Sequence, residues 1–163
     1  DHRDLHLSLR RQRQMCIRDS CIGCAECIVV CPSKAIRIEW NESSQRIQEK
    51  IVEYALGVLK PKKGRVLYVN FIIQVSPQCD CYPFSDASIV PDVGILISTD
   101  PVAIDKASAD LINREDALKH STLQGRRIKD KLKAIYPEVD WTVQLKYAES
   151  LKIGKMTYRL IKI

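Results

Sequence analysis

The 163-residue sequence has no long apolar run, no internal repeat and no low-complexity tract. Its longest uncharged stretch, residues 66–79, contains Asn70, Gln74 and Pro77, so it is too short and too polar to span a bilayer. We therefore expect no membrane span. With 45% hydrophobic and 28% charged residues, the composition also excludes a disordered tail and a fibrous repeat. It fits one domain with a modest core, or one domain with a small appendage.

The sequence also lacks a strong charge of one sign, and aromatic residues make up only 6%. The net charge of +6 is a mild excess that does not by itself indicate a nucleic-acid partner. The most basic segment, residues 126–133, has no interleaved aromatic side chains that could stack on bases. We expect a solvated helix face there rather than a nucleic-acid or membrane patch. Its outward side chains would be Arg127, Lys129, Lys131 and Lys133. The lone His120 is expected at the surface rather than in a metal site.

Residues 10–20 are basic, lack helical or strand periodicity and stop abruptly at a cysteine motif. Their back-translated codons resemble, over the whole segment, the transposon-end adaptor used to build sequencing libraries. We therefore expect residues 1–20, with Cys16, to be a disordered adaptor artefact and exclude them from functional reasoning. The chain would then be a fragment whose natural start lies upstream. The alternative is an ordinary basic N-terminal arm.

Four cysteines follow in the pattern C-x-x-C-x-x-C-x-x-x-C-P, formed by Cys21, Cys24, Cys27 and Cys31. This is the bacterial ferredoxin spacing for a 4Fe-4S cluster. Two residues between successive thiolates let one tight loop reach three corners of the cube, and Gly23 relieves crowding because it has no Cβ. A zinc site usually shows two separated cysteine pairs, and a disulfide framework needs an oxidising compartment.

In two-cluster ferredoxins, the fourth cysteine of each motif binds the other cluster. Cys21, Cys24 and Cys27 would then hold one cluster, and Cys31 would be a ligand of a second cluster. Because the sequence contains a single motif of this type, we expect the partner motif upstream of this chain.

A second thiol pair, Cys79 and Cys81, lies in a loop rich in proline, serine and aspartate. In an extended segment, residues i and i+2 share a face, which suits a metal or cluster edge and suits a mutual disulfide badly. The alternative is two buried thiols that act as small hydrophobic groups. Asp86 and Asp92 could line the same pocket or simply form turns. Asp100 is expected to cap a helix, and the pattern leaves the role of Asp105 open.

Periodicity places the helices and strands of the remaining chain. It predicts helices at residues 47–60, 100–112, 126–135 and 141–151, the last with Gly154 as its C-cap. It predicts strands at residues 35–38, 65–75, 93–97 and 156–163, with the second and third largely buried. The fold class is therefore α/β. We expect a ferredoxin-type motif at residues 21–38 and part of an α/β layered domain at residues 39–163.

Several strings resemble one known family, the uncharacterised Fe–S center proteins of domain-of-unknown-function family 362. The strings are CIGCAECIVVCPSKAI, WNESSQRIQEKIVEYALGVLK, CDCYPFSDASIVPDVGILISTDPVAIDKASADLIN and YPEVDWTVQLKYAESLKIG. The resemblance implies a cytoplasmic prokaryotic protein with a larger α/β domain, into which a module with two ferredoxin-type motifs is inserted. This chain would hold half of that bacterial-type ferredoxin module, followed by the C-terminal segment.

Three functions are consistent with these features. The first is an electron-transfer protein whose clusters pass single electrons to an unknown redox partner. The second is an iron–sulfur enzyme with a separate site at Cys79 and Cys81. The third is a structural cluster without a redox role. If both thiols of the second pair lie in a pocket open to solvent, the enzyme hypothesis gains.

Overall fold

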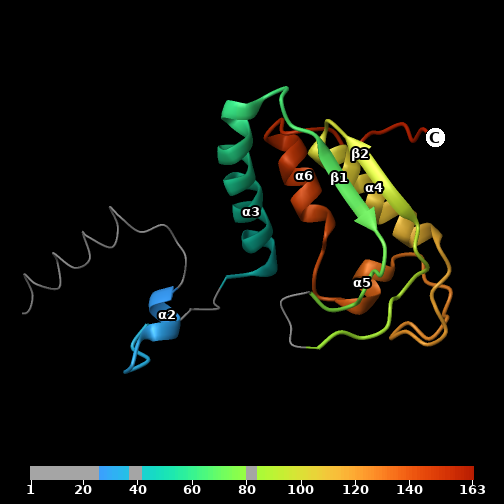
Figure 1. Cartoon of the computed structure of the whole chain (residues 1–163), viewed down its shortest axis with the longest axis horizontal. Helices are drawn as coiled ribbons and strands as arrows, with labels where there is room; N and C mark the ends of the chain where they lie inside the picture. The colour runs from blue at the N-terminus through green and yellow to red at the C-terminus, as the bar shows by residue number, and fades with distance from the viewer. Residues whose placement is uncertain (1–25, 37–41, 80–83) are drawn as a thin grey trace, which may run out of the picture. The chain divides into compact units, whose positions relative to one another are not determined.

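The computed structural model describes residues 26–36, 42–79 and 84–163, and the chain divides into two units, residues 1–41 and 42–163 (Figure 1). The segment expected to be an adaptor artefact lies outside the described residues. In the first unit, the short helix α2 spans Glu26–Val30 and buries no side chain. A turn closed by the Lys34 N–H on the Cys31 carbonyl (3.1 Å) follows it. The strand expected at 35–38 is absent at residues 35 and 36, and the other two positions lie outside the described residues.

The second unit contains two long helices that begin where the capping residues predict. Helix α3 spans Ser44–Leu59, and the Ser43 hydroxyl accepts a hydrogen bond from the Arg46 N–H. The 3-10 turn η1 (Lys60–Lys62) follows at Pro61, which cannot continue an α-helix. Helix α4 spans Pro101–Arg114 and is capped by Asp100. Both helix predictions, and the role of Asp100 as a cap, are confirmed.

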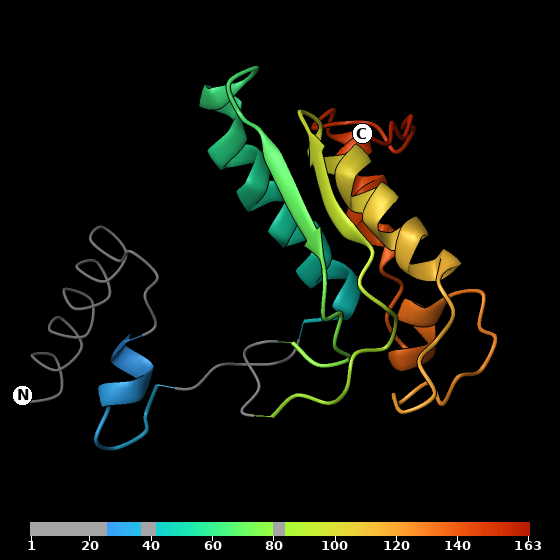
Figure 2. The same ribbon diagram turned by 45° about the vertical axis from the view of Figure 1, so that its right-hand side comes forward.

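Strands β1 (Tyr68–Ile72) and β2 (Gly94–Ser98) form an antiparallel two-stranded sheet, in which Asn70 pairs with Leu96. Helix α4 packs on one face of both strands, as Figure 2 shows. The opposite face exposes Val69, Phe71, Ile95 and Ile97. The prediction of largely buried strands is therefore wrong: in the described residues only one face of the sheet is covered.

Helix α5 spans Lys131–Ile135, and residues 126–130 are not helical. The predicted helix 126–135 therefore begins five residues late, because the Asp130 carboxylate caps it by accepting from the Lys133 N–H (3.0 Å). Lys131 was expected to point outward and is instead 2% exposed. Its Nζ donates to the Asn113 carbonyl at 2.8 Å, in the last turn of α4, where a cation interacts well with unpaired carbonyl groups.

Helix α6 (Thr142–Ser150) confirms the predicted helix at 141–151. Its C-cap is Leu151 rather than Gly154, and residues 156–163 form no strand. A Cβ at position 154 would overlap Asp100 Oδ1, so the glycine allows a close approach between chain segments rather than a helix end. None of the described helices is long and apolar enough to cross a membrane.

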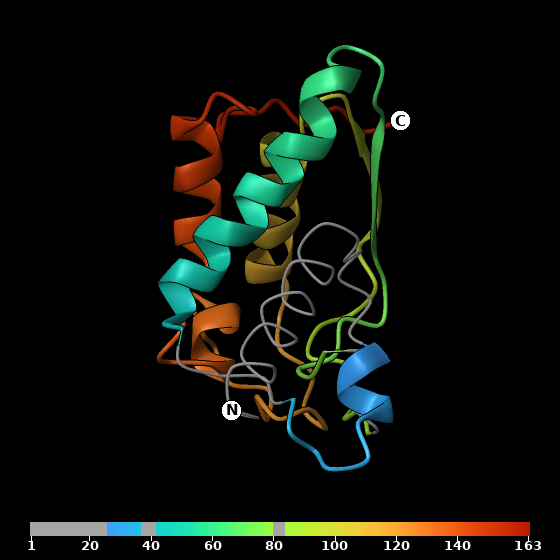
Figure 3. The ribbon, with the colours of Figure 1, turned by 90° about the vertical axis from the view of Figure 1, so that its left-hand side faces the viewer.

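The core of the second unit is divided between two apolar clusters. The first joins α3, α4 and α6 through the buried residues Val52, Val102, Leu145 and Ala148. The second lies under the loops and contains the buried residues Ile89, Val90, Ala117 and Leu123. Together they hold α4 between α6 and β1, an arrangement seen in Figure 3.

Candidate functional site

The described part of the cysteine motif is carried by α2 and the turn after it. Cys27 lies in α2 with an exposed side chain, and Cys31 follows the last residue of the helix and is partly buried. Cys21 and Cys24 lie outside the described residues. Helix α2 is short and ends at Val30, two residues before Pro32. The two described cysteines are therefore near each other in the sequence, and neither side chain is fully buried.

The Cys31 sulfur forms a hydrogen bond with the Ser33 hydroxyl, whose oxygen lies 3.6 Å from Sγ. The nearby backbone N–H groups of Ile36, Ala35 and Ser33 also favour the ionised form of the thiol. These contacts, led by the Ser33 hydroxyl, lower the pKa of Cys31 to about 7. A thiol with this pKa is largely ionised at slightly alkaline pH, and the thiolate is the form that binds metals. Hydrogen bonds to sulfur are also among the features that set the potential of an iron–sulfur cluster.

Within residues 26–36, 42–79 and 84–163, no group of three or more histidine, cysteine, aspartate or glutamate side chains is arranged to hold a metal ion. Two of the four motif thiols, those of Cys21 and Cys24, are outside these ranges. The lone His120 is exposed, as expected.

The structure describes one residue of the second thiol pair. Cys79 is exposed, and Cys81 lies outside the described residues. The nearby aspartates stabilise loops. Asp86 accepts from the Thr122 hydroxyl (2.7 Å), which holds the pKa of that carboxyl below its usual value, and Asp92 accepts from the Gln74 N–H (2.7 Å). The alternative in which these aspartates form turns fits these contacts.

Asp105, whose role the sequence pattern leaves open, lies in a polar cluster between α4 and β1. The Asn70 amide nitrogen donates to Asp105 Oδ1 and to the Ser108 hydroxyl oxygen, both at 2.9 Å. Among the described residues, no group donates a hydrogen bond to the second carboxylate oxygen of Asp105. Sequence reasoning missed Asn70 and Ser108, because the amide is 35 residues from Asp105 and sits in an apolar strand pattern.

The cluster borders a cavity of about 440 Å³. Its polar lining comes from Asp105 and Ser108 on α4, Gln48 on α3 and Gln144 on α6, and its apolar lining includes Trp141. A second cavity of about 440 Å³ runs along residues 69–76 of the β1 region and shares Ser108 and Ile112 with the first. Concave, mainly apolar surfaces with a few polar groups are the usual form of binding sites.

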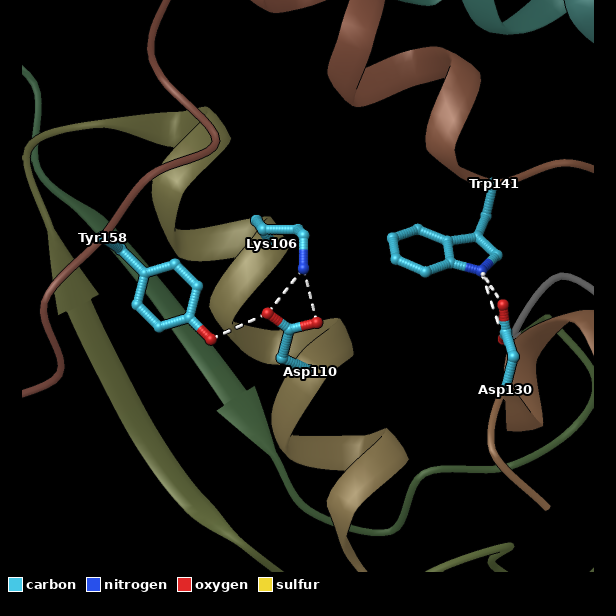
Figure 4. A network of polar contacts seen from close by, with 5 residues as sticks. All are labelled: Lys106, Asp110, Asp130, Trp141 and Tyr158. Carbon is cyan, nitrogen blue, oxygen red and sulfur yellow. Dashed lines mark hydrogen bonds and ion pairs between the residues drawn. The ribbon is translucent and has the colours of Figure 1, made fainter.

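Three further polar contacts join side chains in the C-terminal half of the chain (Figure 4). The Asp110 carboxylate binds Lys106 Nζ at 2.5 Å and accepts from the Tyr158 hydroxyl at 2.8 Å. Burial favours a higher pKa for Asp110, but the two hydrogen bonds outweigh it and hold the pKa below its usual value. The Trp141 indole N–H donates to both oxygens of Asp130, at 3.0 and 3.2 Å. The i, i+4 spacing of Lys106 and Asp110 is the signal that could have indicated the first contact.

Comparison with known proteins gives one match. Residues 12–110 match the family described as Domain of unknown function (DUF362), and the match begins within the segment set aside as an adaptor artefact. No curated protein and no solved structure matches the chain. Since the matched range includes more than half of the sequence, with the cysteine motif, both thiols of the second pair and most of α4, the chain belongs to the DUF362 family.

Proposed function

We propose that the protein binds a 4Fe-4S cluster through Cys21, Cys24 and Cys27, and that Cys31 is a ligand of a second cluster. The proposed role is transfer of single electrons to and from a redox partner. Such clusters, when bound, accept and release one electron at a time at potentials that the surrounding protein adjusts. The proposal places the protein in the cytoplasm, where thiols remain reduced.

The observation that carries the proposal is the environment of Cys31. Its sulfur lies 3.6 Å from the Ser33 hydroxyl oxygen in the turn after α2, and the backbone N–H groups of that turn add to the lowering of its pKa. Donors of this kind stabilise negative charge on sulfur, so the turn favours the thiolate that a cluster requires. The donor set therefore fits an iron–sulfur ligand. The spacing of the four cysteines supports the same assignment.

The apolar surface of α2 supports an electron-transfer role. Val29 and Val30 are exposed beside Cys27 and Cys31. Exposed apolar side chains next to a cluster ligand can cover the cluster from water, or meet a redox partner that approaches it. Neither shielding the cluster nor meeting a redox partner would require a catalytic residue in contact with a substrate.

Two alternatives stay open beside this proposal. An iron–sulfur enzyme would use Cys79 and Cys81 as a second metal or substrate site, and a structural cluster would have no redox role. The Cys79 thiol is exposed, as the enzyme hypothesis requires for one of the two thiols. The position of Cys81 lies outside the described residues, so the pair does not decide between the hypotheses.

The test is anaerobic reconstitution of the full chain with ferrous iron and sulfide, followed by iron and sulfide analysis. Low-temperature EPR after reduction with dithionite then reports the reduced cluster. We expect iron and sulfide in equal amounts and an EPR signal that disappears on mild reoxidation. A protein that binds zinc in preference and remains colourless would contradict the proposal. A cluster that forms but cannot be reduced would leave the structural alternative.

Matched cysteine variants assign the ligands. Cys27→Ser is expected to abolish or strongly reduce the iron content, since it removes one of the three thiolates proposed for one cluster. Cys79→Ser is the control, because it changes an exposed thiol outside the motif in the same way. If Cys79→Ser and Cys81→Ser lower the iron content as much as Cys27→Ser does, the second pair is part of the metal site.

A further inference from the structure

The segment after α6 is not held by backbone pairing. We define the strap as residues 154–163, none of which lies in a helix or a strand. In residues 26–36, 42–79 and 84–163, no backbone-to-backbone hydrogen bond involves the strap, and the last one before it runs from the Ile153 N–H to the Ala148 carbonyl at 3.0 Å. The strap can therefore leave the second unit without breaking a helix or a sheet.

Carboxylates hold the strap instead. Within the described part of the chain, three hydrogen bonds attach it, from the Lys155 N–H to Asp100 Oδ2 at 2.9 Å, from the Met156 N–H to Glu149 Oε1 at 2.8 Å, and from the Tyr158 hydroxyl to Asp110 Oδ2 at 2.8 Å. Figure 4 shows the last of these contacts beside α4. We call the three acceptors the anchors. Two of them belong to α4 and its cap, and the third belongs to α6.

The strap fits closely against the helices. Gly154, Met156 and Tyr158 are partly buried and the residues between them are exposed, which is the alternation of an extended chain lying on a surface. A Cβ at position 154 would overlap Asp100 Oδ1, so the strap passes this anchor at a position where a larger residue would not fit. Met156 packs against the apolar cluster that joins α3, α4 and α6. The attached strap therefore covers part of that cluster.

The strap and its anchors carry opposite charges. The strap contains three basic residues, Lys155, Arg159 and Lys162, and no acidic residue. Each of its three hydrogen bonds is accepted by a carboxylate, and a hydrogen bond to an ionised acceptor is about twice as strong as one between neutral groups. Protonation of the anchors therefore weakens all three attachments together.

The neighbours of Asp110 determine when this anchor loses its charge. It faces Lys106 and Arg114 on α4 and Tyr158 on the strap. Burial raises the pKa of Asp110, but these groups outweigh burial and hold the pKa below its usual value. A carboxyl with a lowered pKa stabilises the attached state above the ordinary value of about 4, and this contribution is lost as the pH falls through the lowered pKa. The strap is therefore attached at neutral pH.

The other two anchors have fewer charged neighbours. Within the described residues, neither Asp100 nor Glu149 forms an ion pair. Asp100 faces Tyr68 of β1, whose pKa is raised first by burial and then by this carboxylate. Backbone N–H groups of the strap and of the first turn of α4 satisfy these two carboxylates. No neighbouring side chain replaces their hydrogen bonds to the strap once the charge is lost.

We propose that the strap is a detachable element that opens as one unit when its carboxylate anchors are protonated, and that its opening uncovers the apolar surface beneath Met156. Helices α4 and α6 remain folded when the strap opens. This device is independent of the proposed cluster, because every contact that forms it lies in the second unit.

Hydrogen exchange of the Lys155 and Met156 amides, measured by NMR on the full chain, tests whether the strap opens as one unit. Tyr158→Phe removes the third attachment and leaves the acceptors of both amides in place. We expect exchange of both amides at pH 7 to become about fivefold to tenfold faster, as for the loss of one hydrogen bond to a charged group. Tyr54→Phe is the matched control, since the Tyr54 side chain is 81% exposed and its hydroxyl lies away from the strap.

A second variant tests the charge of an anchor. Glu149→Gln keeps an acceptor oxygen for the Met156 N–H and removes the charge, as protonation does. We expect faster exchange at Lys155 as well, although the acceptor of that amide is Asp100. Glu138→Gln, a change at an exposed carboxyl outside the anchors, is the control for net charge.

A pH series from 7 to 3 then tests the trigger, with each exchange rate divided by that of an unstructured chain at the same pH. We expect the protection of Lys155 and Met156 to be lost before that of amides inside α4 and α6. Three results would overturn the proposal. The first is exchange at Lys155 and Met156 that changes no more in Tyr158→Phe and Glu149→Gln than in the controls. The second is equal loss of protection inside α4 and α6, because the release would then be unfolding. The third is protection of the strap that stays constant over the whole series.

Discussion

The Asp100 carboxylate joins two parts of the chain that lie 55 residues apart. Its Oδ1 accepts hydrogen bonds from the N–H groups of Val102 and Ala103 at the start of α4, both at 2.9 Å. Its Oδ2 accepts from the Lys155 N–H at 2.9 Å. One side chain thus caps a helix and fixes the segment that follows α6.

We expect Asp100→Ala to destabilise the protein by about 1–2 kcal/mol, the usual cost of losing a helix N-cap, increased by the lost contact to Lys155. Asp100→Asn should cost less, because asparagine caps helices nearly as well and retains an acceptor oxygen. Urea unfolding followed by circular dichroism measures both. Equal losses for the two variants would show that the negative charge, rather than the cap, stabilises this site.

Replacement of glycine by alanine should have opposite effects on stability at positions 154 and 57. A Cβ at 154 would overlap the Asp100 carboxylate, whereas a Cβ at 57 would meet open space. Gly57→Ala should therefore stabilise α3 by about 0.5–1 kcal/mol, because alanine loses less conformational freedom in a helix. Gly154→Ala should destabilise the protein, because the added methyl group would displace the Asp100 carboxylate from its hydrogen bonds. Thermal unfolding of both variants is the measurement, and a stable Gly154→Ala protein would contradict the close approach.

The two faces of the sheet should respond differently to truncation. Ile72 is 3% exposed on the face toward α4, and its neighbour Phe71 is 62% exposed on the other face. Ile72→Ala should cost about 2–5 kcal/mol through lost burial and a cavity. Phe71→Ala should cost well under about 1 kcal/mol in the free chain, although it removes the larger side chain. A large loss from Phe71→Ala would show that another layer covers that face in solution.

Local chemistry explains which parts of the fold were predictable. The start of α3 follows from a serine cap, and the start of α4 from an aspartate cap with a proline at the first turn, signals contained within a few residues. The cysteine spacing is equally local, so the candidate ligands are readable from the sequence. The burial of the strands cannot be read from the sequence, because an apolar run does not indicate which face of a strand another element covers.

The missed features depend on contacts between distant residues. Lys131 belongs to a basic segment that reads as solvated, yet Asn113, 18 residues earlier, binds both its backbone N–H and its Nζ. The Asn70–Asp105 contact joins a strand to a helix across 35 residues. Neither partner carries a spacing or motif that identifies the other, so such pairs become visible only in the folded chain.

The burial of Lys131 gives a further prediction. Lys131→Met keeps most of the side-chain volume but leaves the Asn113 carbonyl at the end of α4 without its donor. We expect a loss of about 1–3 kcal/mol, typical of a buried acceptor left unsatisfied. Lys133→Met is the matched control, since Lys133 is exposed two residues away and its stability change should lie within about 0.5 kcal/mol. If the two variants unfold at the same urea concentration, the Lys131 contact contributes nothing measurable.

The reactivity of Cys31 tests the environment on which the proposed function depends. Its pKa is lowered to about 7, first by the Ser33 hydroxyl and then by backbone N–H groups. Alkylation by iodoacetamide requires the thiolate, so the rate at Cys31 in the metal-free chain should rise with pH and reach half its maximum near pH 7. Peptide mass spectrometry separates Cys31 from the other cysteines. Ser33→Ala removes the largest contribution and should move the midpoint to higher pH, toward the ordinary thiol value, while Ser85→Ala, a change outside the motif, should leave it in place. A midpoint in the unchanged chain near that of an ordinary thiol would contradict the hydrogen-bonded turn and would remove the main structural support for a cluster ligand at this position.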